Sequence, residues 1–208
     1  MMKLLVAGFA PFEGSDVNPS QQIVQALAQK GVAGVELCAA ILPVDRVGGP
    51  AAALAAVQAH QPDAVLCLGQ ATRRPGLSIE RIAVNLLDYA IPDNAGNRVV
   101  DEPVVADGPA AYFATLPVRR MLAAVQAAHV PCELSLSAGA FLCNQVFYAV
   151  LHYLALNMPT VRAGFVHVPT LPEQVASKPA PSMSLETMIM GVQAAITAIG
   201  ATTIGGTK

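Results

Sequence analysis

Residues 34–69 read "GVELCAAILPVDRVGGPAAALAAVQAHQPDAVLCLG", and this stretch decides the fold because it holds a strand, a helix and a second strand in succession. The runs at 34–43 and 63–69 are short and rich in apolar residues, which is typical of strands buried in a parallel sheet. Between them, residues 49–60 have helical character, with Pro50 at the opening position that proline favours. A strand, a helix and a strand of these lengths predict a crossover connection between parallel strands.

The same alternation continues on both sides of this stretch. Further predicted strands are residues 2–9, 133–137 and 163–168, with an extended stretch at 78–91, and further predicted helices are residues 20–31, 116–129, 143–155 and one within 187–207. Ser20 is the expected N-cap of the first helix, and Gly31 is its expected stop. The segments 92–109 and 169–182 are expected to be long surface loops.

These elements define the expected fold class. No linker, internal repeat or low-complexity tract divides the chain of 208 residues, so we predict one domain over residues 1–208. Its expected architecture is α/β in three layers, with an open, twisted, mainly parallel sheet and helices on both faces.

The composition restricts the partners. Only 12% of the residues are charged, about half of the usual share of roughly 25%, and 54% are hydrophobic, so we expect a homo-oligomer that covers apolar surface. A formal net charge of −2 without a basic block gives no electrostatic reason to expect nucleic acid or an anionic membrane as a partner.

Four cysteines without close pairs such as C-x-x-C resemble neither a disulfide framework nor a zinc site, and a reducing cytoplasm fits them best. Residues 187–207 carry no charge, but Gln193 and several threonines and glycines interrupt them. Ile189, Val192 and Ile196 recur at helical spacing, so a packed amphipathic helix is favoured over a membrane span.

In an open parallel sheet the ligand crevice lies beyond the carboxyl ends of the strands. That rule selects four segments for chemistry: "GFAPFEGSDVNPS" (8–20), "GQATRRPG" (69–76), "SAGAFLCN" (137–144) and "HVPTLPEQ" (167–174).

Cys143 stands out because it follows a turn of small residues and opens the helix predicted at 143–155. Unpaired N–H groups and the positive end of the helix dipole favour a thiolate, which is the nucleophilic form of cysteine. The alternative is a buried cysteine that fills space near a helix end. Cys38, Cys67 and Cys132 lie within apolar strands, where a thiol usually serves as a small hydrophobic group.

A cysteine nucleophile needs a base, and the base needs an orienting group. His167 ends a predicted strand and is the best placed of the four histidines, although backbone partners could equally explain a histidine there. Glu80 is a lone carboxylate entering an apolar strand, and a solvated pair with Arg81 is its alternative interpretation. No G-x-G-x-x-G after the first strand, Walker loop or H-E-x-x-H is present, so neither a cofactor nor a metal is expected.

Three aromatic residues flank the same crevice. Phe9 and Phe12 follow the first strand, and Phe141 lies two residues before Cys143. Two interpretations are open for these rings. They could line a pocket for a flat, neutral, mostly apolar group, or they could pack in the core.

Four segments resemble the pyroglutamyl-peptidase I family, in a likeness that runs from about residue 3 to residue 175: "GFAPFEGSDVNPS", "SIERIAVNLLDYAIPDNAGN", "SAGAFLCNQVFYAVLHYLA" and "GFVHVPTLPEQ". The resemblance implies a cytoplasmic, cofactor-free cysteine peptidase that removes N-terminal pyroglutamate from peptides, commonly as a homotetramer. It assigns the nucleophile to Cys143, the base to His167 and the orienting acid to Glu80. It assigns the substrate pocket to Phe9, Phe12, Asn18, Gln70, Ile91, Phe141 and Leu142.

One position departs from the family pattern. The family usually carries arginine where this sequence has Ala90, and the resemblance places that arginine near the catalytic residues. Arg73 or Arg74 could reach the same space and support the oxyanion. The departure leaves two alternatives open, a thiol amidase for another small lactam or acyl amide and a non-catalytic binder of pyroglutamyl peptides.

Overall fold

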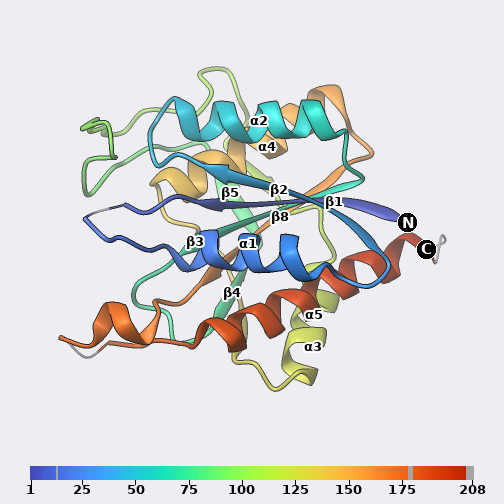
Figure 1. Cartoon of the computed structure of the whole chain (residues 1–208). Coiled ribbons are helices and arrows are strands. Elements are labelled where there is room, and N and C mark those ends of the chain that lie inside the picture. The colour runs from blue at the N-terminus through green and yellow to red at the C-terminus, as the bar shows by residue number, and fades with distance from the viewer. Residues whose placement is uncertain (13, 178–179, 205–208) are drawn as a thin grey trace.

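A six-stranded sheet lies at the centre of the molecule, between two layers of helices (Figure 1). The computed structural model describes residues 1–12, 14–177 and 180–204. From edge to edge the strands are β2 (Val35–Leu42), β1 (Met2–Phe9), β3 (Ala64–Gln70), β8 (Arg162–Val168), β4 (Leu77–Glu80) and β7 (Cys132–Ser135).

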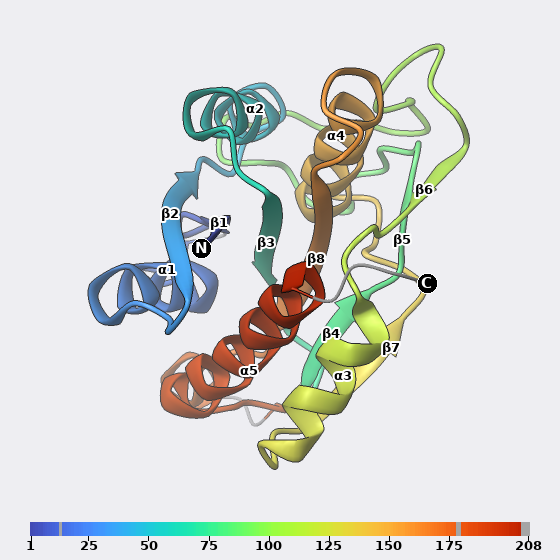
Figure 2. The same cartoon turned by 90° about the vertical axis from the view of Figure 1, so that its right-hand side faces the viewer.

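Helices cover both faces of this sheet (Figure 2). One layer holds α1 (Pro19–Lys30), α3 (Val118–Ala127) and α5 (Leu185–Ile204), and the other holds α2 (Gly48–His60) and α4 (Leu142–Asn157). Alternate side chains of β1 serve the two cores: Leu4 and Val6 pack on the side of α1 and α5, whereas Leu5 and Ala7 pack on the side of α2 and α4. The predicted three-layer α/β fold is therefore confirmed.

The sheet reverses direction at one place. β1, β2, β3 and β8 are mutually parallel, but β4 runs antiparallel to β8. The edge strand β7 pairs with β4 and is parallel to it. The sheet is thus mainly parallel, as predicted, with its reversal between β8 and β4. This reversal decides where Glu80 lies, because it brings the last residue of β4 beside the middle of β8.

The prediction of one extended stretch at 78–91 was wrong. β4 ends at Glu80, and β5 (Ile82–Val84) leaves the main sheet to pair antiparallel with β6 (Ala111–Phe113). All four residues of β4 are buried, whereas only the middle residue of β5 is, so the two pieces occupy different environments. β6 was not predicted because three partly exposed residues after a long loop carry no periodic pattern.

The start of α1 differs by two residues from the prediction. Asn18, not Ser20, is the N-cap: its side-chain oxygen accepts a hydrogen bond from the Ser20 N–H at 3.0 Å. Ser20 lies inside the first turn, where its hydroxyl accepts from the Phe9 N–H at 3.0 Å and so joins α1 to β1. Gly31 ends the helix with a φ of 71°, a conformation that favours glycine, as predicted.

The C-terminal stretch forms the expected helix, α5, which ends at Ile204, and positions 205–207 lie outside the described residues. Val192, Ile196 and Ile199 are fully buried on its inner side. Among the helices of the described residues, none combines the length and the apolar character that crossing a membrane requires.

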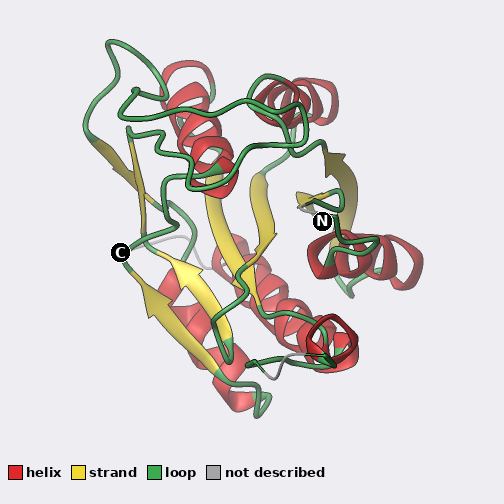
Figure 3. Cartoon of the chain, turned by 90° about the vertical axis from the view of Figure 1, so that its left-hand side faces the viewer, coloured by secondary structure: helices red, strands yellow, loops and turns green. Residues whose placement is uncertain are grey.

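The carboxyl ends of β1, β3 and β8 meet at one edge of the sheet, since these strands are neighbours and parallel. Figure 3 views the molecule from this side, where loops lie over the strand ends. The predicted loop 169–182 lies there and contains one short turn of 3-10 helix, η1 (Pro172–Val175). This edge holds the residues of the candidate site.

Candidate active site

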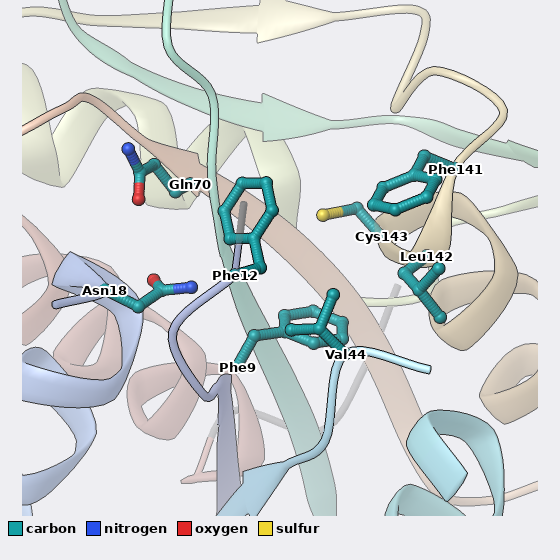
Figure 4. Close-up of a pocket in the computed structure, with 8 residues that line it drawn as sticks. All are labelled: Phe9, Phe12, Asn18, Val44, Gln70, Phe141, Leu142 and Cys143. Carbon is teal, nitrogen blue, oxygen red and sulfur yellow. The ribbon is translucent and has the colours of Figure 1, made fainter. Parts of the chain in front are cut away.

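Cys143 lies in the first turn of α4, as the sequence predicted, although the helix begins one residue earlier, at Leu142. Phe141 is the N-cap of this helix, with extended backbone and no side-chain capping bond. The thiol is half-buried, and Figure 4 shows its sulfur pointing into a pocket. The helix therefore presents the sulfur at the strand edge while its own first N–H groups remain available nearby.

Gly69 of β3 makes the space for that sulfur. A Cβ added at Gly69 would lie 2.7 Å from Cys143 Sγ and 2.8 Å from the ring of Phe165, both closer than real Cβ contacts allow. Gly69 is also the register partner of His167 in β8, so the thiol lies above the strand next to the histidine. Gly69 was not predicted as a site residue, although a glycine that ends a strand of larger apolar residues was a usable signal.

His167 and Glu80 form a buried pair. His167 Nδ1 lies 2.8 Å from Glu80 Oε1, and the Glu80 side chain is fully buried. Glu80 pairs with Phe165 across the antiparallel strands, two residues before His167, so the carboxylate and the imidazole project to the same face. We assign the Nδ1 proton to the histidine as the donor, which leaves Nε2 with a free lone pair.

Glu80 has a second partner, and it is not Arg81. Arg74 Nη1 donates to Glu80 Oε1 at 2.6 Å, and Arg74 Nη2 donates to the Ser137 carbonyl at 2.8 Å. The interpretation of Glu80 as a solvated pair with Arg81 is therefore wrong, because the carboxylate is buried and faces Arg74 and His167. The second oxygen, Oε2, has no hydrogen-bond partner among the described residues.

Burial sets the charge state of the histidine. Burial of His167 lowers the pKa of its imidazole, and the positive charge of Arg74 lowers it too, while the hydrogen bond and charge of Glu80 act in the opposite direction. Burial has the largest effect, so the pKa lies below the ordinary value of 6.5 and the imidazole is neutral at neutral pH. A neutral imidazole can accept a proton.

Burial also decides the state of the thiol. It raises the pKa of Cys143 to about 12, with a further contribution from the negative charge of Glu80. The helix N-terminus was expected to favour a thiolate at rest, and desolvation overrides that effect here. Cys143 is thus a thiol that reacts only when a base takes its proton. Burial raises the pKa of Cys67 to about 12 as well, which fits a thiol that fills space beneath the site.

The small pocket beside the thiol has a cavity volume of about 50 Å³ (Figure 4). Its lining residues are Phe9, Phe12, Asn18, Val44, Gln70, Phe141, Leu142 and Cys143. Six of the seven predicted pocket residues thus lie in it. Val44 was not predicted, although the rule of strand ends, applied after 35–42, would have found it.

Ile91, the seventh predicted pocket residue, does not line the small pocket. It lines a neighbouring cavity of about 360 Å³, which we call the outer cavity. Its lining residues are Phe12, Gln70, Ala71, Thr72, Arg73, Arg74, Ile91, Ala138, Phe141, Cys143 and His167. Cys143 and His167 therefore face one shared space, and Phe12, Gln70 and Phe141 border both cavities.

Two amides of the small pocket are held by the protein. Asn18 accepts from Ser20 and donates from Nδ2 to the Ala10 carbonyl at 3.0 Å, which leaves one Nδ2 hydrogen without a recorded partner in the described part of the chain. The Gln70 and Gln174 amides face each other, and the Nε2 of each lies 3.5 Å from the Oε1 of the other. The pocket thus offers aromatic walls together with a few polar atoms of fixed orientation.

Ala90 is exposed and lines neither the small pocket nor the outer cavity. Its neighbour Tyr89 is buried, donates to Gln145 Oε1 at 2.5 Å and packs edge-on against Phe141 at a ring distance of 4.7 Å. Tyr89, which the sequence analysis did not select, therefore supports a wall of the small pocket. Among the described residues, no group of three histidine, cysteine or acidic side chains could hold a metal ion.

Comparison with known proteins extends this description. Residues 2–202 match the family model described as pyroglutamyl peptidase. A pyrrolidone-carboxylate peptidase of Vibrio vulnificus is 48% identical over 193 residues, which cover 93% of this chain and 90% of that protein. A pyrrolidone-carboxylate peptidase of Streptomyces coelicolor is 46% identical over 202 residues, which cover 97% of this chain and 94% of that protein.

Solved structures agree with these matches. Pyroglutamyl peptidase I of Bacillus amyloliquefaciens superposes with a TM-score of 0.94 at 36% identity, covering 97% of this chain and 98% of that one. A mutant pyrrolidone carboxyl peptidase from Pyrococcus furiosus superposes with a TM-score of 0.92 at 36% identity, covering 97% of this chain and all of that one. The likeness thus extends over almost the whole fold.

Proposed function

This chain belongs to the pyroglutamyl peptidase family, and we propose that Cys143, His167 and Glu80 hydrolyse the amide bond that follows an N-terminal L-pyroglutamyl residue. The observation that carries this assignment is the 2.8 Å contact between His167 and the buried Glu80, in a cavity shared with the Cys143 thiol. A nucleophile, a base and an orienting acid are what acyl transfer by cysteine requires.

The small pocket suits the pyroglutamyl ring. Its aromatic walls, Phe9, Phe12 and Phe141, fit a flat ring, and the amides of Asn18 and Gln70 can pair with the lactam N–H and C=O. The lactam is neutral, so the pocket needs no counter-charge. Proline lacks the lactam carbonyl and would leave a pocket amide unpaired, and an open glutamate would bring a charge into an apolar space.

The reaction begins with proton transfer. His167 Nε2 takes the proton of Cys143, and the thiolate formed attacks the pyroglutamyl carbonyl carbon. The imidazolium then gives its proton to the departing peptide amine as the carbon–nitrogen bond breaks, which leaves a thioester. His167 next takes a proton from water, whose oxygen attacks the thioester, and the proton returns to the Cys143 sulfur as pyroglutamate leaves. Glu80 holds the ring through Nδ1 and stabilises the imidazolium in each half-reaction.

The oxyanion is stabilised by the backbone at the start of α4. Within the described residues, the N–H groups of Leu142 and Asn144 have no backbone partner, the N–H of Cys143 faces its own thiol, and the first bond of this turn runs from Gln145 to Phe141. These donors lie beside the thiol at the positive end of the helix dipole. The site therefore keeps these backbone donors for the oxyanion, although Ala90 stands where the family usually carries arginine.

Arg74 has a positioning role in this proposal. Nη1 binds Glu80 and Nη2 binds the Ser137 carbonyl, so the guanidinium is held against the buried carboxylate and its charge is paired there. It stabilises the charge of Glu80 and ties β4 to the loop that leads into α4. The other candidate for oxyanion support, Arg73, is exposed and lines the outer cavity.

The alternatives drawn from Ala90 are not favoured. A different lactam specificity or a non-catalytic binder would follow if the missing arginine had been part of the site. Ala90 is exposed outside both cavities, and Cys143, His167 and Glu80 are all retained.

The broader organisation also belongs to the proposal. The two cores share one sheet, which supports a single domain over residues 1–208. Val47, Phe113, Leu136 and Leu156 are large apolar side chains that are more than half exposed, which supports a homo-oligomer, with a homotetramer as the family expectation. Four free cysteines support a cytoplasmic location.

We expect purified protein to release a fluorogenic amine from its L-pyroglutamyl amide, and Cys143→Ala to lower kcat/KM by at least about 10³-fold. The prolyl and glutamyl amides of the same amine should react at least about 10³-fold more slowly in the wild type. Cys132→Ala, which removes a thiol from the edge strand β7, is the matched control and should retain activity. Turnover by Cys143→Ala at the wild-type rate would contradict the mechanism.

Gly69→Ala should lower kcat/KM by about 10²-fold or more, because its Cβ would lie only 2.7 Å from the Cys143 sulfur and would displace the nucleophile. Circular dichroism and thermal melting would verify that the variant folds. Gly200→Ala in α5 is the matched control: its Cβ would lie 3.7 Å from the nearest side-chain atom, so activity should not change. Full activity of Gly69→Ala would show that the sulfur does not lie against β3.

Arg74→Gln should lower kcat and move the acid limb of the kcat/KM profile to higher pH. Arg74 lowers the pKa of His167, so without its charge the imidazole takes up a proton at higher pH. Arg119→Gln, on the exposed side of α3, should leave the limb in place. A lower kcat with an unmoved acid limb would reduce Arg74 to a structural residue.

A further inference from the structure

The outer cavity continues into a third cavity that the proposed reaction has not used. This distal cavity has a volume of about 570 Å³ and is lined by Phe12, Gly14, Ser15, Gln70, Thr72, Arg73, Thr170, Gln174, Val175 and Ala180. It shares Phe12, Gln70, Thr72 and Arg73 with the outer cavity. We infer that the two cavities form one groove for the departing peptide, and that Arg73 makes this groove selective for acidic residues close to the scissile bond.

The position of the groove follows from the proposed function, on which this inference rests. The pyroglutamyl ring is assigned to the small pocket, which at about 50 Å³ is much smaller than the outer cavity at about 360 Å³. The departing amine must lie near His167, which donates its proton, and His167 lines the outer cavity. The peptide beyond that amine therefore leaves through the outer cavity, and the distal cavity is its continuation.

The walls of the groove suit a peptide backbone. Ser15, Thr72, Thr170 and Gln174 supply hydroxyl and amide groups along the distal cavity. Gln174 Nε2 donates to Ser15 Oγ and to the Val17 carbonyl at 3.2 Å each, so the loop after β1 and the turn η1 are fixed to each other. The polar groups of the groove are thus held in place before a peptide binds.

Among the described residues that line the groove, the charged ones are all basic. No described residue that lines either cavity is acidic, while Arg73 and Arg74 line the outer cavity and Arg73 also lines the distal one. Arg74 is paired with the buried Glu80. Arg73 is exposed, with no hydrogen bond or ion pair recorded to any described residue, and Glu173 lies outside both sets of lining residues. Arg73 is therefore the guanidinium that remains for a carboxylate of the substrate.

The test compares peptides that differ in one charge. Pyroglutamyl tripeptide amides with Glu, Gln or Lys at the first or second position after pyroglutamate avoid a terminal carboxylate. The wild type should show kcat/KM values in the order Glu, Gln, Lys, with about a three- to tenfold span that shrinks at high salt, since an exposed ion pair is weak and screened. Arg73→Gln should abolish this order, Arg73→Glu should reverse it, and the control Arg119→Gln should preserve it.

A neutral L-pyroglutamyl fluorogenic amide separates the two levels of the proposal. If the wild type and both Arg73 variants hydrolyse this amide but the charged peptides show the same order in all three, the inference about Arg73 is overturned and the proposed function stands. If the folded wild type hydrolyses neither the amide nor any peptide, the proposed function fails and the inference fails with it.

Discussion

The buried carboxylate of Glu80 is the group on which the rest of the site depends. A charge without solvent must be paired, and Glu80 Oε1 accepts from both His167 and Arg74. The pairing is possible because β4 runs antiparallel to β8, which puts Glu80 two residues from His167 on the same face. The reversal within a mainly parallel sheet therefore has a chemical consequence: it delivers an orienting acid that parallel strand ends alone would not supply.

Desolvation also explains why the nucleophile and the base are both uncharged before substrate binds. The same burial raises the pKa of the Cys143 thiol and lowers that of the His167 imidazole, so both groups are neutral at rest. Proton transfer from the thiol to the imidazole is therefore favourable only when the resulting thiolate can attack the carbonyl carbon of a bound substrate. Gly69 lets both groups face the outer cavity, because a larger residue on β3 would overlap the sulfur. Burial, pairing and one missing side chain thus act together.

Much of this could be predicted from the sequence, and the remainder depends on contacts between distant segments. The strand and helix alternation gave the layers, and Cys143 and His167 were recognisable from their places at a helix start and a strand end. The direction of β4 was not predictable, because periodicity reports burial and not pairing. For the same reason Arg74 was not recognised as the second partner of Glu80, and Gly69 was missed because its importance lies in a sulfur 74 positions further along the chain.

The most direct test of this account is ¹⁵N NMR of His167 in the folded protein, titrated through neutral pH and assigned with His167→Gln. We predict a neutral ring at pH 7 that carries its proton on Nδ1, with a pKa below 6.5, since burial outweighs the attraction of Glu80. Glu80→Gln should remove the preference for the Nδ1 proton. A ring that is protonated at both nitrogens at pH 7, or a neutral ring with its proton on Nε2, would contradict the central role given to the buried pair.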